Sequence, residues 1–319
     1  MSKVVVTGGA GFIGSHLVDR LIEDKHDVVV IDNLYAGNRE NVNKKSIFYP
    51  IDIRDEFALD NLFKEFKPEI VFHLAAIPRV QFSIKEPLLT NDVNINGTLK
   101  MLLVSRDNCV RRFIFSSSSS IYGNQEILPL YEQMKPNPLS PYALQKLAGE
   151  YYCKMFCDIY GLETISLRYF NCFGIRQDPH GEYACMIPKF IFLILDNKSP
   201  MIYGDGMNSR DFTPVDNVVG ATVKAGFTNN SDAFGKTFNV GCNNSISVNQ
   251  VFSMIKMLAD KDDLEAMYVD SVIEPKSTMA SISLIKSHLD WEPIIDFSEG
   301  LEKTFLYFKK LQGEKKEKR

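Results

Sequence analysis

The first half of the chain alternates short apolar runs with longer segments in which apolar residues recur every three or four positions. The apolar runs predict strands at 3–7, 28–32, 47–51, 70–75, 112–117 and 164–169. The longer segments predict helices at 12–24, 57–66, 91–107 and 141–160. In the first of these helices, Ile13, Leu17 and Leu21 form one apolar face, which is expected to pack on a sheet. Strand–helix alternation with right-handed crossovers predicts an α/β fold with a doubly wound parallel sheet.

After about residue 170 the pattern changes to loops rich in Gly, Pro and Asn between shorter helical segments. These segments predict helices near 184–196, 213–226, 247–260 and 298–311. We expect a smaller α/β domain here, over the carboxyl ends of the strands, and a cleft between the two domains because no long linker separates them. The expected first domain is 1–169 plus about 212–241, the second is about 170–211 plus 242–312, and 313–319 form a disordered tail.

Charge and hydropathy exclude several classes of partner. The chain has 36 basic and 40 acidic residues, and its longest basic run is the C-terminal 315–319, so a nucleic-acid partner is not expected. No apolar stretch approaches the roughly 20 residues of a membrane helix, and the first strand begins too early to leave room for a signal peptide. These features predict a cytoplasmic protein without a membrane partner.

The cysteines and histidines do not predict a metal site. The six cysteines are scattered, and none combines with the five histidines at a spacing typical of metal ligands. We therefore expect ordinary buried thiols in a reducing compartment. His73 lies inside an apolar run and is expected to be a core residue rather than a catalytic base.

A glycine-rich turn and an acidic residue predict a dinucleotide site. Gly8, Gly11 and Gly14 follow the first strand and open the first helix, where glycines let a backbone approach a pyrophosphate at the helix N-terminus. Asp32 ends the second strand, 18 residues after Gly14. A carboxylate there accepts both ribose hydroxyls of an adenosine and repels a 2′-phosphate. The pattern predicts a Rossmann-like domain that binds NAD rather than NADP.

Three residues form a candidate catalytic group. Tyr142 and Lys146 are four positions apart on a predicted helix, so their side chains share one face. An ammonium group beside a phenol is expected to lower the phenol pKa from its usual value of about 10, and oxidised nicotinamide adds further positive charge. A serine of the run Phe115–Tyr122 ends the preceding strand and can bond the substrate oxygen together with the Tyr142 hydroxyl. This group suits proton abstraction from an alcohol as hydride leaves the same carbon.

With these motifs the chain resembles the extended short-chain dehydrogenases/reductases of the nucleotide-sugar epimerase/dehydratase group, most of all the UDP-hexose 4-epimerases, from residue 3 to about 310. The resemblance implies NAD as cofactor, a UDP-sugar as substrate and a homodimer. It implies catalytic roles for Ser118, Tyr142 and Lys146. It implies cofactor contacts from Gly8, Gly11, Phe12, Ile13, Asp32, Asn33, Asp52, Ile53, Leu74, Ala75, Ala76, Asn94, Tyr142, Lys146 and Tyr169.

The resemblance also implies a set of substrate contacts, from Ser118, Ser119, Asn171, Tyr203, Arg210 and Thr278. In the segment Arg168–Asn171, Tyr169 is expected to approach nicotinamide and Asn171 the substrate pyrophosphate. Arg210 matches an arginine that clamps the UDP phosphates, and Tyr203 is placed to stack on uracil. Thr278 aligns with the position that gates the sugar 2-substituent, where a small residue leaves room for an acetamido group.

Two residues after the catalytic serine favour epimerisation over elimination. Related 4,6-dehydratases carry Asp-Glu directly after that residue, and related decarboxylases carry Glu at the second position, whereas this chain has Ser119 and Ser120. A hydroxyl cannot serve as that acid or base near pH 7. The expected substrate is a UDP-hexose or UDP-N-acetylhexosamine. The alternatives are a dehydratase, a UDP-uronate 4-epimerase using Arg176, or a nucleotide-sensing module without turnover.

The resemblance has one departure and one open alternative. A second phosphate-binding arginine is missing near 271–275, where Glu274 is expected to face ribose and Lys276 to act as a point charge. The dimer surface implied by the family would involve two helices. The candidate residues are Leu99, Leu102 and Leu103 on one helix and Tyr151, Met155 and Ile159 on the other, and all of them could equally pack on the sheet.

Overall fold

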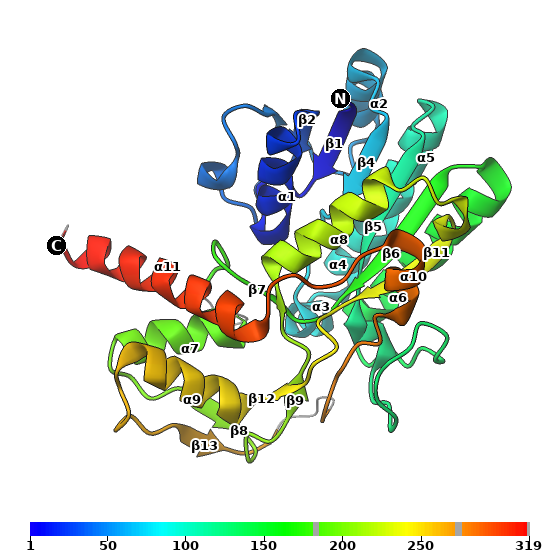
Figure 1. Cartoon of the computed structure of the whole chain (residues 1–319). Helices are drawn as coiled ribbons and strands as arrows, with labels where there is room; N and C mark the ends of the chain where they lie inside the picture. The colour runs from blue at the N-terminus through cyan, green and yellow to red at the C-terminus, as the bar shows by residue number, and fades with distance from the viewer. Residues whose placement is uncertain (181–184, 272–275, 318–319) are drawn as a thin grey trace.

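The apolar runs of the first half pair into one parallel sheet. The computed structural model describes residues 1–180, 185–271 and 276–317, and within them seven strands follow the order β11–β6–β5–β4–β1–β2–β3 (Figure 1). Their bounds are β1 Lys3–Thr7, β2 Asp27–Ile31, β3 Ile47–Tyr49, β4 Ile70–His73, β5 Arg112–Ser118, β6 Glu163–Tyr169 and β11 Lys236–Val240. All neighbouring pairs are parallel. This arrangement confirms the predicted doubly wound α/β fold.

Helices cover both faces of this sheet because its strands are apolar on both sides. One layer contains α1 Phe12–Glu23, α8 Val215–Phe227 and α10 Ser283–Leu289, and the other contains α2 Glu56–Phe66, α5 Thr98–Asp107 and α6 Pro141–Tyr160. Val4 and Val6 pack in the core under α1, whereas Val5 packs in the core under α2 and α5. Leu17 and Leu21 are fully buried, so the apolar face of α1 packs as predicted.

The predicted helix 91–107 is longer and less regular than expected. Helix α3 Val80–Lys85 precedes α4 Pro87–Asn91, and a π-helical turn at Asp92–Gly97 joins α4 to α5. Gly97 has space only for hydrogen, because a Cβ there would lie 2.7 Å from the Ile53 side chain. At this turn the chain passes close to Ile53 in the loop after β3, and Asn94 faces the loop after β4.

The second lobe has its own apolar core, lined by Ile191, Phe252 and Phe305. Its helices are α7 Met186–Leu195, α9 Val248–Ala259 and α11 Phe297–Glu317, which gather in the lower part of Figure 1. Its short strands pair as β8 Met201–Tyr203 with β13 Met267–Val269, β9 Ser209–Arg210 with β12 Ile246–Ser247, and β7 Cys172–Phe173 with β10 Thr213–Pro214. This lobe lies at the carboxyl ends of the main strands, as expected.

Two boundaries differ from the predictions. Helix α10 and Trp291 pack in the first core beside β11, although they fall in the range expected for the second domain. Helix α11 continues to Glu317, so 313–317, expected to be disordered, is helical. Residues 311–317 contain no proline, and Lys310 lies one turn from Glu314 at 4.0 Å, which favours continuation of the helix.

Candidate functional site

The carboxyl ends of the strands open into one large cavity, which the second lobe closes from the other side. Its volume is about 1130 Å³, above the roughly 300–1,000 Å³ of a typical site for one small ligand. It lies beside the β1–β4 junction, where the strand order reverses and parallel sheets usually bind nucleotides. The space therefore suits a dinucleotide and a second ligand side by side.

The glycine-rich turn after β1 leaves no room for side chains. Gly8 has φ of +72°, and a Cβ there would lie 2.8 Å from the Ala75 nitrogen. A Cβ at Gly14 would lie 2.1 Å from the Gly8 oxygen. Helix α1 therefore begins directly at the cavity wall, with Gly11 as its N-cap, and presents its first N–H groups to a bound anion. This cradle fits the pyrophosphate of NAD.

Asp32 is held in place at the end of β2. Its carboxylate accepts hydrogen bonds from the Ala10 nitrogen (3.0 Å) and the Leu34 nitrogen (2.8 Å). A Cβ on Gly37 would lie 2.9 Å from both carboxylate oxygens, so Gly37 keeps the space beside Asp32 free. Burial raises the pKa of Asp32, and the two backbone hydrogen bonds oppose that rise. The fixed carboxylate in the cavity wall fits the ribose of NAD.

Arg54 was missed from the sequence and organises the wall near Asp52. Its guanidinium donates to both Asp52 oxygens, at 2.9 and 2.8 Å, and to Asp92 at 2.8 Å. These bonds lower the pKa of Asp52 to about 2. Asn33 donates to the same carboxylate at 2.9 Å. The only local signal for Arg54 is its position two residues after Asp52, since the bond to Asp92 joins segments distant in sequence.

The three predicted catalytic residues meet in the cavity wall. Ser140 caps α6 by accepting from the Ala143 nitrogen at 3.2 Å, which places Tyr142 in the first turn of the helix. Tyr142 is 8% exposed, and the Ser118 hydroxyl at the end of β5 lies near enough to the Tyr142 phenol to lower its pKa. The Lys146 ammonium lies 5.9 Å from the centre of the Tyr142 ring and donates to the Ser116 carbonyl oxygen at 2.7 Å.

The pKa of Tyr142 moves in the direction opposite to the prediction. Burial raises it to about 12, and the hydrogen bond from Ser118 opposes this rise without cancelling it. Burial also lowers the pKa of Lys146 to about 8. The expected lowering of the Tyr142 pKa is therefore wrong for the protein's own groups, because desolvation by burial outweighs the opposing effect of Ser118.

All the predicted substrate residues except Tyr203 line the cavity. Asn171 has φ of +22°, and its amide nitrogen lies 3.4 Å from the Thr278 hydroxyl. Arg210 ends β9 and donates to the Ser209 carbonyl oxygen at 2.8 Å. Ser119, Asn171, Arg210 and Thr278 all contribute to the wall. These positions are compatible with the predicted contacts to a second ligand beside the dinucleotide.

Most of the predicted cofactor residues also line the cavity, namely Gly8, Gly11, Phe12, Ile13, Asp32, Asn33, Asp52, Ile53, Leu74, Ala75, Ala76, Tyr142, Lys146 and Tyr169. Asn94 does not; its buried side chain accepts from the Ile77 nitrogen at 2.8 Å and donates to Gln145, so it acts on the wall through the loop after β4. Tyr203 is 47% exposed on β8 and does not line the cavity. Its predicted stacking on uracil is therefore not supported by its position.

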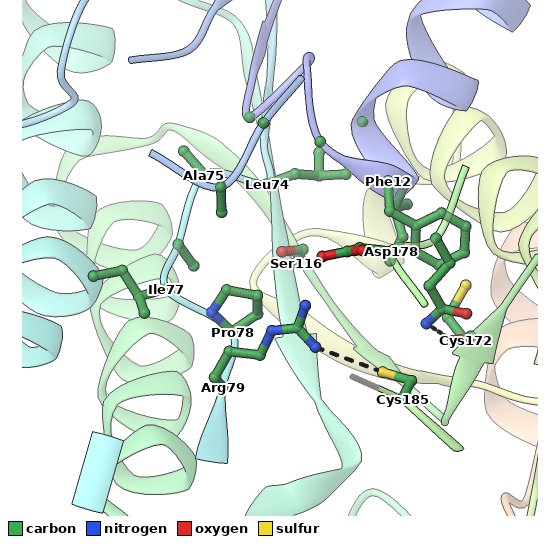
Figure 2. Close-up of a pocket in the computed structure, with 18 of the residues that line it drawn as sticks. Phe12, Leu74, Ala75, Ile77, Pro78, Arg79, Ser116, Cys172, Asp178 and Cys185 are labelled. Carbon is green, nitrogen blue, oxygen red and sulfur yellow. Dashed lines mark hydrogen bonds between the residues drawn. The ribbon is translucent and has the colours of Figure 1, made fainter. Parts of the chain in front are cut away.

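Further residues in the wall were not singled out from the sequence. Figure 2 shows Arg79, from the loop after β4, reaching toward Cys185, with Nη1 3.9 Å from the thiol sulfur. Asp178 lies in the same wall. Arg176 forms an ion pair with Asp19 at 2.8 Å, so its predicted role toward a substrate carboxylate competes with this contact. Glu274 and the rest of 272–275, and 181–184 of the loop before α7, lie outside the described residues.

The remaining cysteines and histidines have ordinary environments. Cys153 is buried, but Cys109 and Cys185 are exposed, so the prediction of buried thiols is wrong for these two. Among the residues that the structure describes, no group of His, Cys, Asp and Glu side chains could hold a metal ion. Within the same ranges, none of the helices combines the length and apolar character needed to cross a membrane.

His73 is the core residue that its apolar run predicts. Its two ring nitrogens lie 2.8 Å from the Thr7 hydroxyl and 3.0 Å from the Thr98 hydroxyl. Burial lowers its pKa to about 3, so the imidazole is neutral at physiological pH.

This burial predicts a pH dependence of stability. Between pH 6.5 and 3, His73 is protonated in the unfolded state but stays neutral in the folded state. The free energy of unfolding therefore falls as the pH drops. From pH 6.5 to 4 the wild-type free energy of unfolding should fall by about 3 kcal/mol more than that of His73→Gln. Urea titrations at several pH values measure this. If the free energy of unfolding depends on pH in the same way for wild type and His73→Gln, the prediction is wrong. The control is His180→Gln, at an exposed position, which should follow wild type.

Comparison with known proteins agrees with this geometry. The model of the NAD dependent epimerase/dehydratase family matches residues 4–241. A putative UDP-glucose 4-epimerase of Methanocaldococcus jannaschii is 40% identical over 308 residues, which cover 96% of this chain and 98% of that protein. Two solved structures also align with this chain, each over 97% of this chain and 99% of its own. They are the UDP-glucose 4-epimerase of Thermotoga maritima with UDP-glucose (38% identity, TM-score 0.93) and the UDP-N-acetylglucosamine 4-epimerase of Methanobrevibacter ruminantium in complex with UDP-N-acetylmuramic acid (39%, 0.91).

Proposed function

Because the chain belongs to the NAD-dependent epimerase/dehydratase family, we propose that it inverts C4 of a UDP-sugar through a transient 4-keto sugar. The substrate pair is UDP-glucose and UDP-galactose, or the corresponding N-acetylhexosamines. The observation that carries this proposal is the cluster of Ser118, Tyr142 and Lys146 in the wall of a cavity large enough for cofactor and substrate together.

Each residue of the cluster has one task in the proposed reaction. Tyr142 removes the proton from the sugar O4, and Ser118 holds that oxygen while bonding the phenol. Lys146, fixed by the Ser116 carbonyl oxygen, holds the nicotinamide ribose with its other N–H groups. Oxidised nicotinamide, when bound, accepts the C4 hydride and supplies the positive charge that a phenolate at neutral pH requires. Tyr142 later returns the proton to the inverted alcohol.

The serines beyond Ser118 favour return of the hydride over elimination. Ser119 lines the cavity, and the buried Ser120 hydroxyl has no hydrogen-bond partner among the described residues. Neither group can act as an acid or base near pH 7. A 4-keto sugar anchored by its pyrophosphate at Asn171 and Arg210 can therefore turn and accept hydride on its other face, so the cofactor is regenerated.

The residue at position 278 supports the proposed choice of sugar. Thr278 is small and leaves space where a larger side chain would exclude an acetamido group. The alternatives are a UDP-uronate 4-epimerase or a dehydratase of the same family. The uronate alternative relied on Arg176, whose guanidinium is already paired with Asp19. The geometry therefore favours a neutral sugar.

Incubation with UDP-glucose and UDP-N-acetylglucosamine, without added NADH, tests this function. We expect NMR to show conversion to the C4-inverted sugar, and mass spectrometry to show that the mass of the UDP-sugar is unchanged. A product lighter by one water would show a dehydratase instead. Turnover of UDP-glucuronate alone would favour the uronate alternative.

We also propose a homodimer formed through α6. Tyr151, Met155 and Ile159 are 58%, 49% and 61% exposed and share one face of this helix, with Leu144 exposed on the same helix. The leucines expected to join them do not: Leu102 is fully buried, and the core under α2 and α5 also takes up Leu99 and Leu103. An exposed apolar stripe of this kind is typical of an interface between subunits.

Ile159→Glu is therefore expected to convert the dimer to a monomer, because a carboxylate would be buried in the apolar interface. Size-exclusion chromatography with light scattering measures the mass directly. Leu306→Glu, at an exposed position on α11, is the control and should leave the mass unchanged. A wild-type protein that is monomeric at micromolar concentration would refute the proposed interface.

A further inference from the structure

Two buried charged side chains, Glu150 and Arg168, have no role in the reaction described above. They lie beside the end of β5, the catalytic strand, which carries Ser118. Glu150 lies one turn after Lys146 on α6, and Arg168 lies on β6 beside the end of β5. Arg168 donates from Nε to Glu150 Oε1 at 2.9 Å and from Nη2 to Oε2 at 2.8 Å. Both side chains are almost completely buried. A guanidinium–carboxylate pair with two parallel bonds fixes the orientation of both groups.

On one side, this pair holds the end of β5. The Ser117 hydroxyl donates to Glu150 Oε1. Its two neighbours in the strand act on the catalytic residues, since the Ser116 carbonyl oxygen accepts from Lys146 and the Ser118 hydroxyl lowers the pKa of Tyr142. Glu150 lies on α6, the helix that also carries Tyr142 and Lys146. It thus binds the middle residue of the segment 116–118, which sets the positions of the reacting groups.

On the other side, the same guanidinium is linked through hydrogen bonds to residues that follow Thr278. It donates from Nη1 to the Tyr122 hydroxyl at 2.8 Å, which donates to Asn239 Oδ1 at 2.6 Å. The Asn239 amide donates to the Leu130 carbonyl oxygen at 2.8 Å. The Leu130 backbone pairs with residues 279–281, directly after Thr278 in the cavity wall. A continuous chain of hydrogen bonds therefore joins α6 to the substrate side of the cavity.

We propose that the Glu150–Arg168 pair is a positioning element, which holds 116–118 against Tyr142 and Lys146 and ties this segment to residues 278–281. The inference rests on the proposed function, since these distances matter for turnover only if the cluster performs the chemistry. Stability alone does not require such a pair, because packed apolar residues often replace a buried ion pair without loss. Its location between the catalytic helix and the catalytic strand explains why charged groups are used here.

Ser117→Ala tests the link to β5 while leaving the ion pair intact. We expect kcat to fall at least fivefold, with KM and bound NAD within twofold of wild type. Amide hydrogen exchange of 116–118 should become faster. The matched control is Glu163→Gln, which removes the partner of Arg112 at the opposite ends of the same two strands. This control should keep kcat within twofold of wild type.

Glu150→Gln adds a readout that a purely structural role would not change. The titratable groups facing Lys146 are Tyr142, Glu150 and Cys153 on its own helix and His73 on β4. The Glu150 carboxylate raises the pKa of Lys146 against the effect of burial. Its neutralisation should therefore move the alkaline limb of the kcat–pH profile to lower pH. Glu150→Asp keeps the charge and should leave the limb in place.

The outcomes separate this inference from the proposed function. If wild type inverts no UDP-sugar, the proposed function fails, and the exchange measurement on Ser117→Ala still decides the inference. Wild-type kcat and wild-type exchange at 116–118 in Ser117→Ala would overturn it. An equal loss of kcat in Glu163→Gln and Glu150→Gln would overturn it as well. If Glu150→Gln does not fold, Ser117→Ala and its control decide alone.

Discussion

Tyr142→Phe is expected to lower the rate of C4 inversion by about 10²–10⁴-fold, the usual contribution of a positioned acid–base group. The change removes one oxygen from a nearly buried ring and leaves the packing of α6 intact. Bound NAD and the free energy of unfolding should therefore stay close to wild type. Steady-state kinetics on the accepted UDP-sugar and release of NAD on denaturation measure the two quantities.

The control for this variant is Tyr160→Phe, at the exposed end of the same helix. It should retain wild-type kcat. Wild-type turnover by Tyr142→Phe would mean that another group takes the proton. Loss of NAD from that variant would mean that the Tyr142 hydroxyl is needed for cofactor binding as well.

Asp32→Asn is expected to weaken NAD binding about tenfold to a hundredfold, since hydrogen bonds to a charged acceptor contribute about 1.5–3 kcal/mol. Asparagine can still accept from the Ala10 nitrogen, so the turn itself should survive. Because the negative charge is removed, the preference for NAD over NADP should also decrease. Titration calorimetry of the cofactor-free protein with both dinucleotides gives the two affinities.

A control at the other end of the same strand keeps this result specific. Asp27 begins β2 and is exposed, so Asp27→Asn should bind both dinucleotides as wild type does. Unchanged NAD affinity in Asp32→Asn would place the adenosine ribose elsewhere.

The parts of the fold that local pattern could predict are those with long, regular periodicity. The buried strands of the main sheet are short apolar runs, and α6 has the predicted bounds of 141–160. In the structure Ser140 caps its first turn and Gly161 ends it. The strands β7 to β10 are only two or three residues long, too short to show any period. The π-helical turn at 92–97 passes close to Ile53, an approach between separate segments that no local pattern reveals.

In the candidate site, too, some features are local in the sequence and others depend on how the chain folds. Gly8, Asp32 and the Tyr142–Lys146 spacing are local signals, and the structure brings them into one cavity. The direction of the Tyr142 pKa could not be predicted, because it depends on how much water the surrounding elements exclude.

Residues linked across long sequence distances were missed for a related reason. Arg54 pairs with Asp92, and Arg79 approaches Cys185 from a different lobe. Arg168 lay within a recognised motif, but its role is visible only once β6 and α6 are seen to pack together.

The central claim is that hydride leaves and returns to the same sugar carbon within one cavity. The most direct measurement follows a deuterium label at C4 of the UDP-sugar that wild type accepts, in ordinary water. We expect the inverted product to keep the deuterium at C4, because the label is carried by the bound cofactor and never exchanges with solvent. Loss of the label to water during inversion would contradict it.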